Sequence, residues 1–292
     1  MMLAHGDPTA SPLTPHLHPD VVAFVAVLVL AYWLALTRLG PRVLPPGEPA
    51  WSRRQAGFLV AGIAALWAFS DWPVHDLAEG YLYSVHMLQH SVYTLVLPPL
   101  FILGTPPWLW RWLLRPVMGL FRQLVRPWAA VLVFSAVTVA THLPSFVTAA
   151  VRSGPAHFAQ HTALVLASVL VWWPLLGPLP EAPRLSAPVH QMVYVFAQSL
   201  VPSVVGSSLI WAQGVPYRVY EEFPRLWGID ALDDQQWAGT IMEVVEGSLI
   251  IAMVSVVFLR MVRNEQRSPN SRTDRPGRVP SSAGLQAGMG KP

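Results

Sequence analysis

The stretch YLYSVHMLQHSVYTLVLPPLFILG, residues 81–104, combines the composition of a membrane-spanning helix with two histidines one helical turn apart. It contains no Asp, Glu, Lys or Arg, and a helix needs about 20 mostly apolar residues to cross the hydrocarbon core of a bilayer. Imidazoles are rare in such segments because an unpaired polar group in hydrocarbon is costly. The stretch therefore predicts a transmembrane helix whose histidines have a function.

The whole chain has the composition of an integral membrane protein. Hydrophobic residues make up 53% of its 292 residues and charged residues only 12%, against about 25% charged residues in soluble domains. Continuous apolar runs exclude the alternating pattern of a transmembrane β-barrel. We predict an all-α bundle of seven transmembrane helices at residues 21–37, 55–70, 81–104, 127–148, 156–177, 188–212 and 236–259.

The distribution of charge predicts the orientation of this bundle. Most arginines lie in the first, third and fifth predicted loops or in the C-terminal tail, whereas Asp71, Asp76 and Asp230 lie in other loops. Positive loops stay in the cytoplasm, so we predict an outer N-terminus and a cytoplasmic C-terminus. The predicted domains are an outer tail at 1–20, a seven-helix domain at 21–260, and a disordered basic tail at 261–292 that contacts membrane lipid. We therefore attribute the net charge of +3 to the arginines that orient the protein in the membrane, and we expect no nucleic-acid binding.

Five histidines on three successive predicted helices fall in one outer layer of the membrane. At about 1.5 Å per residue, His86 and His90 lie roughly 8 and 14 Å below the outer end of their helix. His142 lies about 9 Å from the outer end of the next helix, and His157 and His161 begin the one after it. HMLQH and HFAQH share the spacing HxxxH, which places both imidazoles on one helix face. The chain has no Cys, and neutral imidazole suits copper, zinc, iron and nickel. We predict a metal site at these five residues; the alternative is a set of structural hydrogen bonds.

Several other side chains near this layer are candidate ligands or supporting residues. Met87 and Met242 offer thioethers, although methionine in a membrane helix more often serves packing. Glu243 and Glu246 lie on one face of the last helix about 11 to 15 Å from its start, where a carboxyl group must be protonated, paired or directed into a polar cavity. Asp234, just before the start of that helix, is a candidate N-cap or a candidate hydrogen-bond partner that would orient a metal ligand.

The remaining histidines are not assigned to the site. We expect His5, His16 and His18 to be solvated in the outer tail, His75 to lie on the outer surface, and His190 to lie at the inner end of its helix. No nucleophile with an orienting base and no Gly-rich phosphate loop is visible, so we do not expect an enzyme.

Successive motifs of the chain resemble the CtaG family of cytochrome c oxidase assembly factors. The matching segments are HMLQH followed by LPPLFILGTP, then THLPSFVTAA, HFAQHTALVLASVLVWWPLLGPLP and DDQQWAGTIM. The resemblance implies a seven-span protein of the bacterial plasma membrane that helps to form an active haem-copper oxidase. It implies copper as the metal and oxidase subunits as partners. Glu243 and Glu246 have no match in the family pattern. The family's motif residues fall on His86, His90, His142, His157, His161 and Asp234.

Three functions stay open at this point. The first is a copper-binding assembly factor, whose outer-layer histidines lie at the depth that the resemblance implies for the oxidase's own copper. The second is a haem-binding electron carrier with axial histidines from facing helices. The third is a copper permease, although the inner halves of the helices offer few polar groups beyond His190. We expect both HxxxH pairs and His142 to form one shared site with one metal per chain; homo-oligomerisation stays open.

Overall fold

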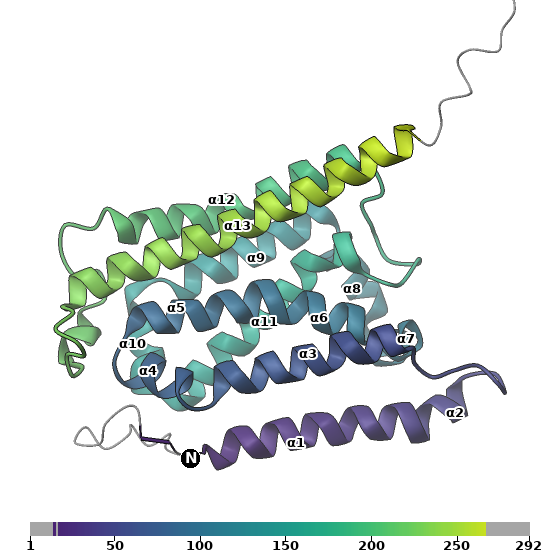
Figure 1. The fold of residues 1–292 in the computed structure, drawn as a ribbon, viewed down its shortest axis with the longest axis horizontal. Helices are drawn as coiled ribbons and strands as arrows, with labels where there is room; N and C mark the ends of the chain where they lie inside the picture. The colour runs from purple at the N-terminus through teal and green to yellow at the C-terminus, as the bar shows by residue number, and fades with distance from the viewer. Residues whose placement is uncertain (1–13, 16, 267–292) are drawn as a thin grey trace, which may run out of the picture.

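The computed structural model describes residues 14–15 and 17–266, which form helices and connecting loops with no β-strand among them. Among these described residues, five helices are long and apolar enough to cross a membrane, and up to seven spans result if each of two bent helix pairs counts as one. The described part of the chain is therefore an all-helical membrane bundle, whose long helices lie side by side (Figure 1).

The helices follow the predicted segments closely, with additional short helices between them. A π-helical turn at Ala35–Leu39 joins α1 to α2, and another at Val92–Val96 joins α5 to α6. The bent pairs are α3 with α4, at 44°, and the α7–α8 segment with α9, at 93°. The bounds are α1 (Pro19–Leu34), α2 (Gly40–Val43), α3 (Arg53–Ser70), α4 (Val74–Gly80), α5 (Tyr83–Ser91), α6 (Leu97–Gly104), α7 (Pro107–Leu114), α8 (Met118–Leu124), α9 (Pro127–Thr141), α10 (Pro144–Arg152), α11 (Gly154–Leu176), α12 (Pro188–Ile210) and α13 (Ala231–Gln266), with 3₁₀ turns at Arg115–Val117 and Arg218–Glu222.

The two ends of the bundle carry different charges. The short helices α4 and α10 and the start of α13 lie at one end, and α2, α7 and α8 lie at the other (Figure 1). We call the end with α4 and α10 the acidic end, because it carries Asp71, Asp76, Glu79, Asp230, Asp233 and Asp234. We call the end with α2, α7 and α8 the basic end, because it carries Arg38, Arg42, Arg53, Arg54, Arg111, Arg115, Arg122 and Arg126. At the basic end, Arg111 donates two hydrogen bonds to Glu181, at 2.6 and 3.1 Å, and these bonds lower the pKa of the Glu181 carboxyl group.

The predicted helix at 127–148 is interrupted, which corrects the expected position of His142. Helix α9 ends at Thr141, and Pro144 begins a separate helix, α10. The proline ring disfavours helical backbone at the preceding residue, and Leu143 is extended with φ −69° and ψ 138°. His142 therefore caps the C-terminus of α9 instead of lying inside a helix.

The boundaries of the last helix also differ from the prediction. Helix α13 continues to Gln266, so the segment at 261–266, which we predicted to be disordered, is helical. The rest of the predicted C-terminal tail, together with His5 and His16, lies outside the described residues.

A proline in the α5–α6 span ties this span to α11. Pro98 lacks an N–H group, so the carbonyl of Thr94, one turn earlier, loses its usual helical donor. The indole Nε1 of Trp172 on α11 donates a hydrogen bond to this carbonyl oxygen at 2.8 Å. The π-helical turn at Val92–Val96 immediately precedes the prolines. The helices that carry the two HxxxH pairs are thus joined beyond the histidines, about one turn after His90 and about three turns after His161.

Candidate metal centre

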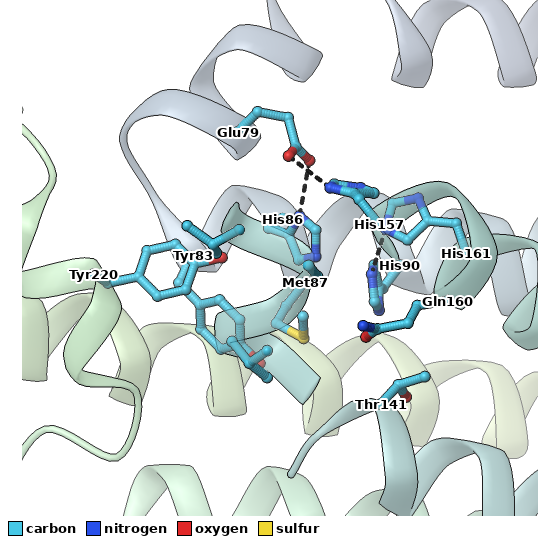
Figure 2. A pocket seen from close by; sticks show the side chains of 13 residues that line it. Glu79, Tyr83, His86, Met87, His90, Thr141, His157, Gln160, His161 and Tyr220 are labelled. Carbon is cyan, nitrogen blue, oxygen red and sulfur yellow. Dashed lines mark hydrogen bonds and ion pairs between the residues drawn. The ribbon is translucent and has the colours of Figure 1, made fainter. Parts of the chain in front are cut away.

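The two HxxxH pairs face each other (Figure 2). They lie near the acidic end of the bundle, beside Glu79 of α4. His86 and His90 come from α5, and His157 and His161 come from α11. The ring centroids are 4.4 Å apart for His86 and His90, 4.1 Å for His157 and His161, and 4.6 Å for His90 and His161. The Nε2 atoms of His90 and His161 approach to 2.8 Å. We call these four residues the histidine cluster.

A carboxylate that the sequence analysis did not assign to the site holds one side of the cluster. Glu79 on α4 places Oε1 3.2 Å from Nδ1 of His86 and Oε2 2.9 Å from Nδ1 of His157. Figure 2 shows the carboxyl group bridging the two rings. An ionised carboxylate can only accept, so both Nδ1 atoms carry hydrogens and both Nε2 atoms keep their lone pairs. This is the form in which imidazole binds a metal, with a carboxylate orienting the ring.

The cluster contains two overlapping groups of candidate ligands. One atom each from His86, His90 and His161 lie within 4.8 Å of one another, and so do atoms from Glu79, His86 and His157. His86 belongs to both groups. A cavity of about 20 Å³ lies among these side chains and is also lined by Tyr83, Met87 and Tyr220. Such a space holds about one water molecule or one ion.

His142 lies beside the cluster and faces a different cavity. Its ring centroid is 6.1 Å from that of His90, with the rings perpendicular. His142 is in neither group of close ligand atoms. It lines a second cavity together with Met87, Met242 and Glu246. The five predicted histidines thus come together in one region, but only four of them surround the smaller cavity.

Asp234 acts on the helix that carries His86 and His90. Its side chain accepts hydrogen bonds from the backbone N–H groups of Tyr83, at 2.7 Å, and Ser84, at 3.0 Å. These donors are in the first turn of α5 and have no partner within their own helix. Asp234 therefore caps α5 from α13, while Asp230 accepts from the first turn of α13 itself.

The remaining predicted residues separate into two environments. Met87 lines both cavities, and Met242 and Glu246 line only the second. Glu243 accepts hydrogen bonds from Ser203, at 3.2 Å, and Ser207, at 3.1 Å, both on α12. It therefore links α12 to α13.

The histidines outside the cluster are placed as follows. His18 is not a solvated tail residue, because its Nδ1 lies 2.8 Å from Asp71 and its Nε2 lies 3.2 Å from Asp76. These contacts fasten the start of α1 to the α3–α4 corner. The His75 ring lies 4.8 Å from that of His18. His190 is exposed at the start of α12, at the basic end.

Comparison with known proteins gives a family for this arrangement. Searches of curated proteins and of solved structures find no match. The model of the family described as cytochrome c oxidase caa3 assembly factor matches residues 30–264. This range contains the histidine cluster, Glu79, His142 and Asp234. The chain therefore belongs to the Caa3_CtaG family of cytochrome c oxidase caa3 assembly factors.

Proposed function

We propose that this family member binds copper at the histidine cluster and supports formation of the copper-containing centre of a caa3-type oxidase. The observation that carries the proposal is the grouping of ligand atoms from His86, His90 and His161 within 4.8 Å. The carboxylate of Glu79 sets the ring of His86 in the ligating tautomer. A three-imidazole site without thiolate suits copper, which also binds nitrogen ligands more tightly than the other divalent first-row metals do.

The location of the cluster supports delivery from the outer side of a bacterial plasma membrane. The basic end of the bundle carries most of the described arginines, and such ends face the cytoplasm. The acidic end, with the histidine cluster, then faces outward. A copper ion held there by exchangeable imidazoles can pass to an oxidase subunit in the same layer of the membrane without crossing the bilayer.

The size of the cavity disfavours the alternative of a haem-binding electron carrier. A site for a ligand of that size has a volume of about 300 Å³ or more, whereas the cavity inside the cluster measures about 20 Å³. A haem would therefore require α5 and α11 to separate, which the Trp172 hydrogen bond opposes. The permease alternative needs polar groups through to the basic end, where His190 lies exposed and apart from the cluster.

The proposed function is tested by oxidase maturation in cells. A caa3-type oxidase is produced in a bacterial host that lacks its own assembly factor, together with this protein or a variant. We expect His86→Ala to lower the copper content and activity of the purified oxidase to the level found without the factor. The exposed His190→Ala variant is the matched control and should behave as the parent does. Full oxidase copper with His86→Ala, at equal membrane levels of both variants, would contradict the proposal.

A further inference from the structure

A second cavity, of about 50 Å³, adjoins the histidine cluster and extends further along the bundle. Met87 and His90 line both cavities. From this shared wall the second cavity continues along the α5–α6 span to Thr94 and Leu95, away from the acidic end. Its other walls come from α9, α11, α12 and α13 through Phe134, Thr138, His142, Leu164, Pro202, Met242 and Glu246.

His142 presents a prepared ligand atom to this second cavity. Its Nδ1 lies 2.8 Å from the carbonyl oxygen of Thr138, so Nδ1 carries the hydrogen and donates it. The lone pair of the ring is therefore on Nε2, which is buried and has no hydrogen-bond partner among the described residues. A backbone carbonyl that fixes the tautomer in this way is the usual support of a metal-binding histidine.

Glu246 brings a carboxyl group to the same cavity. Its side chain belongs to a residue that is only 9% exposed. The hydroxyl of Thr138 on the same wall is also buried without a partner among the described residues. Buried polar groups are normally paired, so this concentration indicates a polar or ionic occupant.

We propose that the second cavity is a separate copper(I) site, formed by Nε2 of His142, the carboxylate of Glu246 and the thioethers of Met242 and Met87. Thioether and imidazole together favour copper(I) among the biological metals, and a bound cation would stabilise the ionised form of the buried carboxyl group. A water cluster would satisfy the polar groups but would make no use of the two sulfur atoms. This inference rests on the proposed function and extends it. The histidine cluster and the second site would be two neighbouring copper sites whose cavities share Met87 and His90 as lining residues.

The experiment is a copper(I) titration of the full-length protein in detergent. The protein is loaded with excess copper(I) under anaerobic reducing conditions, freed of unbound ion, and measured for copper per chain and for X-ray absorption at the copper edge. Because the chain contains no Cys, any copper–sulfur scattering comes from methionine. The parent should hold two equivalents and show copper–sulfur scattering.

Methionine variants on one helix isolate the second site. Met242→Leu conserves side-chain volume and should lose one equivalent and reduce the sulfur scattering. Met253→Leu, further along α13 and outside both cavities, is the matched control and should keep both equivalents. His161→Ala should lose one equivalent and retain the sulfur scattering, because His161 does not line the second cavity.

The copper content of the parent and of Met242→Leu distinguishes failure of the second site from failure of the proposed function. A parent with one equivalent that survives in Met242→Leu would overturn the second site and leave the proposed function standing. Two equivalents in Met242→Leu would overturn it as well. A parent that retains no copper would overturn both proposals.

Discussion

Glu79 organises two histidines through one carboxyl group. Each of its oxygens faces the Nδ1 atom of a different ring, one on α5 and one on α11. The carboxylate thereby keeps two Nε2 lone pairs available and joins three helices at the acidic end. A single residue outside the long helices thus determines the orientation of half of the cluster.

Replacing Glu79 with Gln should weaken copper(I) binding about 10- to 100-fold, the usual effect of losing a carboxylate that orients a histidine ligand. A glutamine amide has one accepting oxygen, and its NH₂ group would face a second N–H donor. The dissociation constant is measured by competition with a chromogenic copper(I) chelator. Glu48→Gln, at an exposed loop position, is the matched control and should leave the constant unchanged. Equal affinity of the Glu79→Gln variant and the parent would show that Glu79 does not orient the ligands.

The sequence predicts the histidines of the site better than their partners. The HxxxH spacing identifies four imidazoles on two helix faces, because helical periodicity fixes which side chains share a face. Glu79 lies in a short helix before its span, where an acidic residue is ordinary and no periodic pattern includes it. The one available signal was its position beside the start of the α5 span, on the same side of the membrane as the histidines. Contacts between helices depend on packing, which spacing along one helix does not describe.

At the scale of elements, the cluster depends on how the first turn of α5 is held. Asp234 reaches from α13 to two backbone N–H groups at the start of α5, only two to three residues before His86. Asp234 is 3% exposed, so water cannot replace it. The position of α13 is therefore coupled to that of the helix that carries His86 and His90.

Asp234→Ala should lower the stability of the protein by about 1–3 kcal/mol, since it leaves buried backbone donors without acceptors. It should also increase hydrogen exchange in peptides that contain Tyr83 and Ser84. Thermal unfolding in detergent and exchange mass spectrometry provide the two measurements. Asp233→Ala, at the exposed neighbouring position, is the control and should change neither. Unchanged exchange at the start of α5 in Asp234→Ala would show that the cap does not stabilise this helix.

The elements were largely predictable, and the main exception has a clear cause. The apolar runs mark the helices because each must satisfy its own backbone in hydrocarbon. The predicted helix at 127–148 was wrong past Thr141, since Pro144 and the extended Leu143 end α9 there. The break turns His142 toward the second cavity. The role of Asp234 as a cap for another helix also depended on tertiary packing, which its own sequence neighbours do not reveal.

In the whole molecule, the charged ends and the two cavities follow one another along the long axis of the bundle. The acidic end carries the histidine cluster, the second cavity lies further along the bundle, and the basic end carries most of the described arginines. Such an asymmetry sets the orientation of a membrane protein during insertion. Delivery of copper from the outer side therefore requires the acidic end to face the outside of the cell.

Reporter fusions test this orientation directly. A reporter that is active only in the cytoplasm should be active when fused after Pro292 and inactive when inserted in the loop between α12 and α13. The reason is the excess of arginine at the basic end. A reporter that is active only outside the cytoplasm should give the reverse pattern at both positions. The opposite result would place the histidine cluster at the cytoplasmic face and remove the argument for delivery from outside.

The assignment of the histidine cluster as a copper site is tested by measuring the copper retained per chain in the purified parent, His86→Ala, His161→Ala and the double variant. Both residues belong to the group whose ligand atoms lie within 4.8 Å, and neither lines the second cavity. Ligands that complete one coordination sphere are not additive. We predict that each single variant and the double variant all retain one equivalent fewer than the parent. Parent levels of copper in either single variant would contradict the assignment of the histidine cluster as a copper site.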